Sequence, residues 1–79
     1  MNVHVRFFAA SREAAGMGSL TQALPAGSTL GELAGILRGA YPDLGSLRLS
    51  FAVNMTYAGP DTILRDGDEV ACIPPVGGG

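Results

Sequence analysis

The chain has 79 residues, which leaves room for one domain and no second one. Hydrophobic residues make up 47% of it and charged residues 15%, a balance that excludes an intrinsically disordered chain. The formal net charge is −2, and the 5 positive residues, all arginine, are scattered along the sequence. A nucleic-acid-binding protein needs a clustered basic face, so this class is excluded.

The cysteine and histidine content and the hydropathy of the chain exclude further classes of protein. The single cysteine, Cys72, cannot form an internal disulfide, and one histidine with one cysteine cannot build a tetrahedral zinc site. No apolar run approaches the roughly 20 residues of a membrane span, and the N-terminus lacks the apolar block of a signal peptide. We expect a soluble, cytoplasmic domain that binds no metal, no nucleic acid and no membrane.

The chain begins with alternating apolar and polar side chains, the apolar set being Val3, Val5 and Phe7. This period of two predicts a strand with one buried face, and it places the ring of Phe8 on the opposite, exposed face. Ser11 is positioned to cap a short helical turn over 12–15, which Gly16 ends.

The strongest local signal is the start of a helix, which follows a weak strand over 19–24 and a turn over 25–27. Thr29 and Glu32 have the spacing of a capping box, in which each side chain satisfies a free backbone donor. Pro42 ends the helix. The apolar residues in between fall on one stripe at helical spacing: Leu30, Leu33, Leu37, Ala40 and Tyr41.

The second half of the chain is expected to supply more strands. These are predicted over 49–54, 62–64 and 69–73, with turns over 58–60 and 66–68. Phe51 and Val53 share one strand face. Because there is a single amphipathic helix, the elements predict an α+β fold of two layers, a mixed sheet with the main helix packed across one face.

No group of residues has the pattern of a catalytic or metal site. His4 has no acid or nucleophile beside it and is expected on the surface. Cys72 shares a period-two register with Val70, which predicts a small buried side chain rather than a reactive thiol. Asp66, Asp68 and Glu69 lack the spacing of a calcium loop and are expected in a solvated hairpin turn.

The C-terminal residues have a different character. Pro74 and Pro75 cannot donate to a sheet and favour an extended chain that leaves the domain. Val76 and three glycines follow, so we expect a folded domain over 1–76 and a flexible tail over 77–79. Such a tail is thin enough to thread a narrow tunnel in another protein, and the only functional group it presents is the carboxylate of Gly79.

These features together resemble the MoaD/ThiS family of ubiquitin-like sulfur carriers, most closely its molybdopterin branch, the small subunits of molybdopterin synthase. The resemblance covers essentially the whole chain, and the combination is more specific than any one piece. The segments that carry it are Phe7-Phe8-Ala9, Arg12-Glu13-Ala14-Ala15-Gly16, Tyr41-Pro42-Asp43-Leu44, Val53-Asn54, Leu64-Arg65-Asp66-Gly67-Asp68-Glu69-Val70-Ala71 and Pro74-Pro75-Val76, with the closing Gly78-Gly79.

The resemblance implies a β-grasp fold and a carrier that is not an enzyme by itself and binds no cofactor. In this family an E1-like, MoeB-like adenylyltransferase uses ATP to activate the terminal carboxylate, here that of Gly79. A sulfur donor protein then converts it to a thiocarboxylate. In the molybdopterin branch the tail, with Gly78 as its narrow neck, enters a MoaE-like large subunit and gives the sulfur to a cyclic pyranopterin for the molybdenum cofactor.

The resemblance also implies a docking surface for the large subunit. Family members dock through apolar side chains at positions matching Phe8, Tyr57 and Ile73, and the tail residues Pro75, Val76 and Gly77 are expected to join them. The strand pattern agrees, because Phe8 and Ile73 lie opposite the core-facing sets of their strands.

Three alternatives remain open. Gly77 stands where the molybdopterin branch often has Thr or Ser, and a triple glycine also occurs in carriers of thiazole (thiamine) synthesis, whereas the helical segment over 12–16 favours the molybdopterin branch. A ubiquitin-like modifier, joined through Gly79 to a target lysine, has the same kind of tail. The third alternative is a binding module whose tail is inert.

Overall fold

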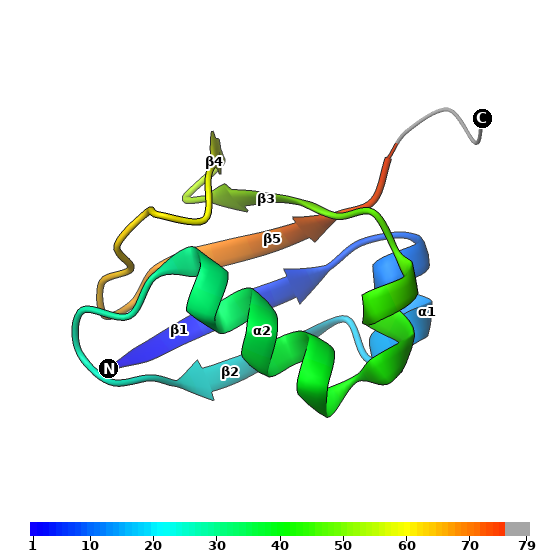
Figure 1. Ribbon diagram of the computed structural model, residues 1–79, viewed down its shortest axis with the longest axis horizontal. Helices are drawn as coiled ribbons and strands as arrows, with labels where there is room; N and C mark the ends of the chain where they lie inside the picture. Colours follow the sequence, from blue (N-terminus) through cyan, green and yellow to red (C-terminus); the bar gives the residue numbers. More distant parts are fainter. Residues whose placement is uncertain (76–79) are drawn as a thin grey trace.

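The computed structural model describes residues 1–75 and has two layers, a mixed sheet and a helix across one of its faces (Figure 1). The 5-stranded sheet has the order β2-β1-β5-β3-β4. The α+β arrangement predicted from the sequence is therefore confirmed. The elements are β1 (Asn2–Phe7), α1 (Ala10–Ala15), β2 (Ser19–Ala23), α2 (Leu30–Ala40), the 3-10 helix η1 (Pro42–Ser46), β3 (Ser50–Val53), β4 (Thr56–Ala58) and β5 (Glu69–Ile73).

The two central strands, β1 and β5, come from opposite ends of the chain and pair in parallel, with Phe7 beside Cys72. β2 pairs antiparallel with β1, and β3 pairs antiparallel with both β5 and β4. Parallel neighbours cannot be joined by a tight turn, so the chain between β1 and β5 must cross from one side of the pair to the other. The crossing segment contains α2, the main helix (Figure 1).

The core lies between α2 and the sheet. Val3, Val5 and Phe7 are buried, and their alternation with exposed neighbours confirms the predicted face of β1. The α2 stripe is confirmed in Leu30, Leu33 and Leu37 but wrong at Ala40, which is exposed; Ala34 is buried instead. Ala40 is the last residue of the helix. Tyr41 is half-buried, and its ring stands edge-on to that of Phe7 at 6.2 Å.

The boundaries of α2 follow from local chemistry. The capping box is present: the amide of Glu32 donates to Thr29 Oγ1 at 3.2 Å, and the amide of Thr29 donates to Glu32 Oε1 at 3.4 Å. The helix ends before Pro42, as predicted. The 3-10 helix η1 follows, and the side chain of its residue Leu44 is buried. Among the residues that the structure describes, no helix has both the length and the apolar character that a membrane crossing requires.

The hairpin of β3 and β4 corrects the predicted strands. β3 is shorter than the 49–54 prediction, β4 was not predicted, and 62–64 forms no strand, because Ile63 makes only an isolated bridge to Thr29. The turn lies at Asn54 and Met55, which adopt positive φ angles of 49° and 70°. Glycine usually marks such a turn, and its absence here hid the hairpin. The remaining turn and strand, at Gly67 and β5, match the prediction.

Ser11 has a role other than the predicted helix cap. It lies inside α1, the N-cap position is Ala9, and no side chain caps the helix. The buried hydroxyl of Ser11 instead accepts from the amide of Phe8 at 2.9 Å and lies 2.6 Å from the carbonyl oxygen of Phe8 and 3.1 Å from that of Cys72. The Ser11 hydroxyl thus ties the ends of β1 and β5 together. The left-handed Gly16 ends α1 as predicted.

Replacing Ser11 with alanine should lower the free energy of unfolding by about 1 kcal/mol, because it removes the buried hydrogen bonds of the hydroxyl, whereas the Phe8 and Cys72 backbone groups keep their bonds to other backbone atoms. Urea unfolding followed by circular dichroism measures the change. Ser46→Ala is the matched control: it removes a hydroxyl that also donates to a carbonyl oxygen, that of Asp43 at 3.0 Å, but in an exposed turn. Equal losses in the two variants would show that the tie does not stabilise the fold.

Burial raises the pKa of the Cys72 thiol from 9.0 to about 12, and the positive charge of Arg38 opposes part of that rise. The unfolded chain therefore loses this proton at lower pH than the folded one. Stability should fall as the pH rises through the window between the two pKa values, on the order of 1 kcal/mol per pH unit.

Urea titrations at several pH values in this alkaline window, with a reductant present, measure this slope. Cys72→Ala should be less stable at neutral pH, because it leaves a small cavity, but should lose the part of the slope that the thiol contributes. An unchanged slope in Cys72→Ala would assign the alkaline destabilisation to other groups.

Candidate functional site

The sheet face opposite α2, called here the outer face, carries no covering element among residues 1–75. Side chains that alternate with the buried sets of the strands point to it. They form two regions of different character. One is apolar and lies toward the C-terminal end of β5, and the other is polar and lies toward the start of β5.

Phe8 and Ile73 form one side of the apolar region. β1 and β5 are in register at Phe7 and Cys72, so the next residue on each chain, Phe8 and Ile73, falls on the outer face side by side. The backbone agrees, because the amide of Phe8 donates to the carbonyl oxygen of Cys72 at 3.3 Å. Phe8 is 47% exposed and Ile73 is half-buried. The structure thus brings these two predicted docking residues together.

Tyr57 forms the other side of the apolar region, on the edge strand β4. It pairs with Ala52 of β3, which in turn pairs with Ala71 of β5. The two alanines form a floor of small side chains between Tyr57, which is 70% exposed, and Ile73; Ala52 itself is buried, at 6% exposed, and Ala71 is half-buried. The sequence analysis did not predict this floor, although an alanine at an outer-facing position in each of two strands could have indicated it. Tyr57, Ala52, Ala71, Ile73 and Phe8 together are called here the apolar platform.

The point at which the chain leaves the sheet is fixed beside the apolar platform. The Ser11 hydroxyl lies within hydrogen-bonding distance of the Cys72 carbonyl oxygen, one residue before Ile73. Pro74 is half-buried and Pro75 is exposed, so the described chain ends pointing into solvent (Figure 1). The other predicted site residues, Val76, Gly77, Gly78 and Gly79, lie outside the described residues, and their roles stay predictions.

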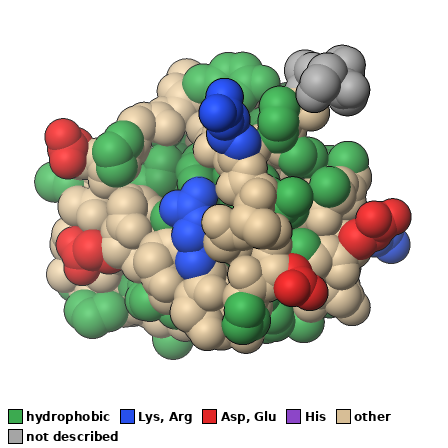
Figure 2. All heavy atoms as spheres, turned by 45° about the vertical axis from the view of Figure 1, so that its right-hand side comes forward, with side chains coloured by type: hydrophobic (Ala, Val, Ile, Leu, Met, Phe, Trp, Pro, Cys, Tyr) green, Lys and Arg blue, Asp and Glu red, His purple; other side chains and the backbone are tan. Residues whose placement is uncertain are grey.

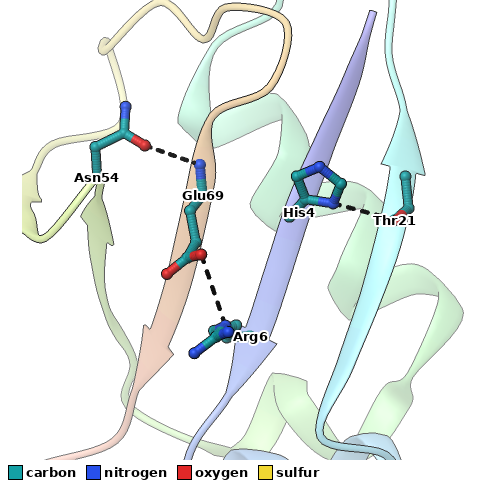
Figure 3. Close-up of polar contacts among 5 residues, drawn as sticks. All are labelled: His4, Arg6, Thr21, Asn54 and Glu69. Carbon is teal, nitrogen blue, oxygen red and sulfur yellow. Dashed lines mark hydrogen bonds and ion pairs between the residues drawn. The ribbon is translucent and has the colours of Figure 1, made fainter.

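The polar region of the outer face contains one ion pair and two hydrogen bonds, drawn in Figure 3. Arg6 Nε lies 3.7 Å from Glu69 Oε2, His4 Nδ1 lies 3.3 Å from Thr21 Oγ1, and the amide of Glu69 donates to Asn54 Oδ1 at 3.0 Å. These contacts are exposed, and an exposed ion pair contributes at most about 1 kcal/mol. The region gives the face a polar border next to the apolar platform, as protein interfaces have.

The described residues bring no catalytic group to this face. His4 is exposed and Cys72 is buried in the core, as predicted. The predicted turn at Asp66 and Asp68 is confirmed, but it closes no hairpin, because 62–64 forms no strand. Asp66 accepts from the amide of Asn2 at 2.8 Å, and Asp68 accepts from the amide of Arg65 at 2.8 Å. Within residues 1–75, no three His, Cys, Asp or Glu side chains gather as a metal site would require. What the face offers chemically is protein contact.

The sequence is similar to proteins of one family along its whole length. The ThiS family is matched over residues 5–79. The molybdopterin synthase sulfur carrier subunit of Chlamydomonas reinhardtii is 41% identical over 83 aligned residues, which span 100% of both chains.

Two solved structures show the same fold. The small archaeal modifier protein 1 of Haloferax volcanii matches with a TM-score of 0.84 at 27% identity, over 95% of this chain and 98% of that chain. In the complex of subunits 1 and 2 of the molybdopterin-converting factor from Helicobacter pylori, one chain matches with a TM-score of 0.70 at 31% identity, over 100% of both chains. The fold is the ubiquitin-like β-grasp that the resemblance implied, and the chain belongs to the ThiS family.

Proposed function

We propose that this protein is the sulfur-carrier subunit of a molybdopterin synthase. It docks on a large subunit through the apolar platform and delivers a C-terminal thiocarboxylate on Gly79 into that subunit. The observation that supports this most directly is the geometry of the described chain end: β5 leads out of the domain beside an exposed apolar surface. Similarity to sulfur carrier subunits over the full chain supports the same role.

The chemistry would be carried out with partners. A carboxylate is a poor electrophile, so an E1-like partner would join the Gly79 carboxylate to AMP from ATP and release pyrophosphate. Sulfur delivered by a donor protein at the oxidation level of sulfide would then attack the carbonyl carbon of the acyl-adenylate, AMP would leave as its C–O bond breaks, and the thiocarboxylate would remain. The large subunit would transfer this sulfur to a cyclic pyranopterin in molybdenum cofactor biosynthesis, with Gly78 and Gly77 passing through its entrance. The structure of a complex of subunits 1 and 2 in Helicobacter pylori supports a large-subunit partner.

A second function is supported by one specific observation, the match to a small archaeal modifier protein. A modifier would use the same activated Gly79 but pass its carbonyl to a lysine amine of a target protein. This chain contains no lysine, so it could not serve as its own target. A sulfur carrier for thiazole synthesis would share the activation and differ in the acceptor.

Deleting Gly78 and Gly79 should abolish activation and leave the fold unchanged, because the core residues among the described 1–75 all lie within 3–72. The full chain and the deletion variant are incubated with an E1-like partner, ATP and a sulfur donor. Intact mass spectrometry should then find one oxygen replaced by sulfur in the full chain only.

Heavier conjugates in a cell lysate, without the sulfur-bearing product, would favour the modifier. An unchanged mass of the full chain would contradict the carrier. A large drop in the melting temperature of the deletion variant would show that the tail belongs to the folded domain.

Phe8→Asp should weaken binding to the large subunit about tenfold or more, because it places a charge at the centre of an apolar contact. Titration calorimetry measures the affinity, and circular dichroism checks the fold. Ile36→Asp is the matched control, since Ile36 is similarly exposed at 42% but lies on α2, away from the outer face. Equal affinities for Phe8→Asp and the unmodified chain would place the docking surface elsewhere.

A further inference from the structure

The inner face of the sheet, which faces α2, is too wide for one helix to cover. Five strands have four spacings of about 4.8 Å and so a width of about 19 Å, whereas a helix with its side chains is about 10–12 Å across. α2 lies over the β2-β1-β5 side and leaves the β3–β4 hairpin without a covering element (Figure 1). Phe51 and Ala58, which point inward from that hairpin, are accordingly only half-buried.

The space left between α2 and the hairpin is a hollow of about 570 Å³, called here the α2–β4 groove. Gly31, Ala34 and Arg38 line it on the helix side, and Phe51, Tyr57 and Ala58 line it on the strand side. A hollow of this size is within the usual range for a bound ligand or an inserted side chain. Its walls are mostly apolar and hold one charged group, Arg38.

Small residues leave the groove unfilled, and a close contact between α2 and Pro60 holds one end of it in place. At Gly31 the helix approaches Pro60 so closely that an added Cβ would lie 3.2 Å from the Pro60 Cβ atom. The amide of Gly31 donates to the carbonyl oxygen of Pro60 at 2.9 Å. Ala34 and Ala58 face the groove with single methyl groups. The groove is therefore part of the folded structure and does not depend on a side-chain rearrangement.

The edge of β4 offers backbone groups beside the groove. The pairs of Val53 with Thr56 and of Phe51 with Ala58 flank the pair of Ala52 with Tyr57. Because Val53 and Thr56 close a two-residue hairpin, they form a hydrogen-bonded pair, and the next pair along is of the non-hydrogen-bonded kind. The N–H and C=O groups of Tyr57 therefore point away from β3, toward the position that an added strand would occupy.

Charge indicates what kind of segment would fit. Among residues 1–75 the single ion pair joins Arg6 with Glu69, so no described carboxylate pairs with Arg38. No acidic residue lines the groove. Figure 2 shows one positively charged group at the centre of the view and another above it, both next to hydrophobic side chains, whereas the acidic groups lie to the left and to the right of these two. A carboxylate supplied from outside would complete this arrangement.

We propose that the α2–β4 groove is a second docking site, which takes an extended, acidic segment of a partner protein. The segment pairs with the backbone of Tyr57 at the edge of β4 and inserts an apolar side chain between α2 and the hairpin. It presents a carboxylate to Arg38. The groove opens between α2 and the hairpin and shares Tyr57 with the apolar platform, but none of the platform's other residues lines it. The proposal does not depend on the sulfur-carrier function.

The test uses the full-length, ¹⁵N-labelled chain and a synthetic probe, the blocked peptide Asp-Glu-Val-Thr-Val-Ile-Val-Asp-Glu. On titration to millimolar peptide, the amide signals of Ala34, Arg38 and Tyr57 should shift and those of His4 and Ala71 should not. The same peptide with lysine at every acidic position should have a Kd at least about fivefold higher. An absence of shifts, or shifts confined to the outer face, would overturn the proposal.

Two variants and a control locate the contact. Arg38→Glu should raise the Kd of the acidic peptide about fivefold or more, and Ala58→Trp, which fills the groove, should abolish binding. Arg65→Glu makes the same change of charge outside the groove and should leave Kd unchanged. Circular dichroism confirms that each variant is folded. Shifts of the groove signals with protein concentration alone would assign the groove to a second copy of this chain and overturn the proposal.

Discussion

The parallel pairing of β1 with β5 is the constraint on which the rest of this structure depends. It places the first and last strands of the chain side by side at the centre of the sheet. It also forces the residues between them to cross over, and the crossing segment supplies the main helix that closes the core. Because the register sets Phe7 beside Cys72, the next residues, Phe8 and Ile73, meet on the uncovered face. One pairing thus builds the core, one side of the apolar platform and the point at which the chain leaves the sheet.

Ser11 shows how closely the site and the fold are coupled. Burying a hydroxyl destabilises a fold unless the hydroxyl is hydrogen-bonded. Here the Ser11 hydroxyl contacts backbone groups at the ends of both central strands. The direction of the chain beyond Ile73 is fixed within the domain, before the prolines stiffen it. In the carrier function proposed above, such a fixed base would reduce the freedom that the chain end loses on entering a partner.

The two faces of the sheet are unequal for a geometric reason. A single helix covers one face, and only part of its width. The outer face is therefore exposed in full, and the inner face is exposed at the β3–β4 hairpin. Small residues line both places: Ala71 and the buried Ala52 on the outer face, and Gly31, Ala58 and the buried Ala34 along the groove. They make the first surface flat and the second hollow, and those two shapes suit different kinds of partner contact.

The sequence by itself determined the elements whose signals are local. The alternation of Val3, Val5 and Phe7, the Thr29–Glu32 capping box and the glycines of the tight turns act over a few residues, and each matched the structure. Only the tertiary structure decided the hairpin at Asn54 and Met55, two non-glycine residues at positive φ, where the Asn54 side chain bonds to Asp68 and Glu69, 14 and 15 positions away. The same is true of Ser11, whose partner Cys72 is 61 positions away, and of the apolar platform and the α2–β4 groove. All of these features depend on which strands become neighbours in the sheet, and the spacing of residues along the chain does not specify the strand order.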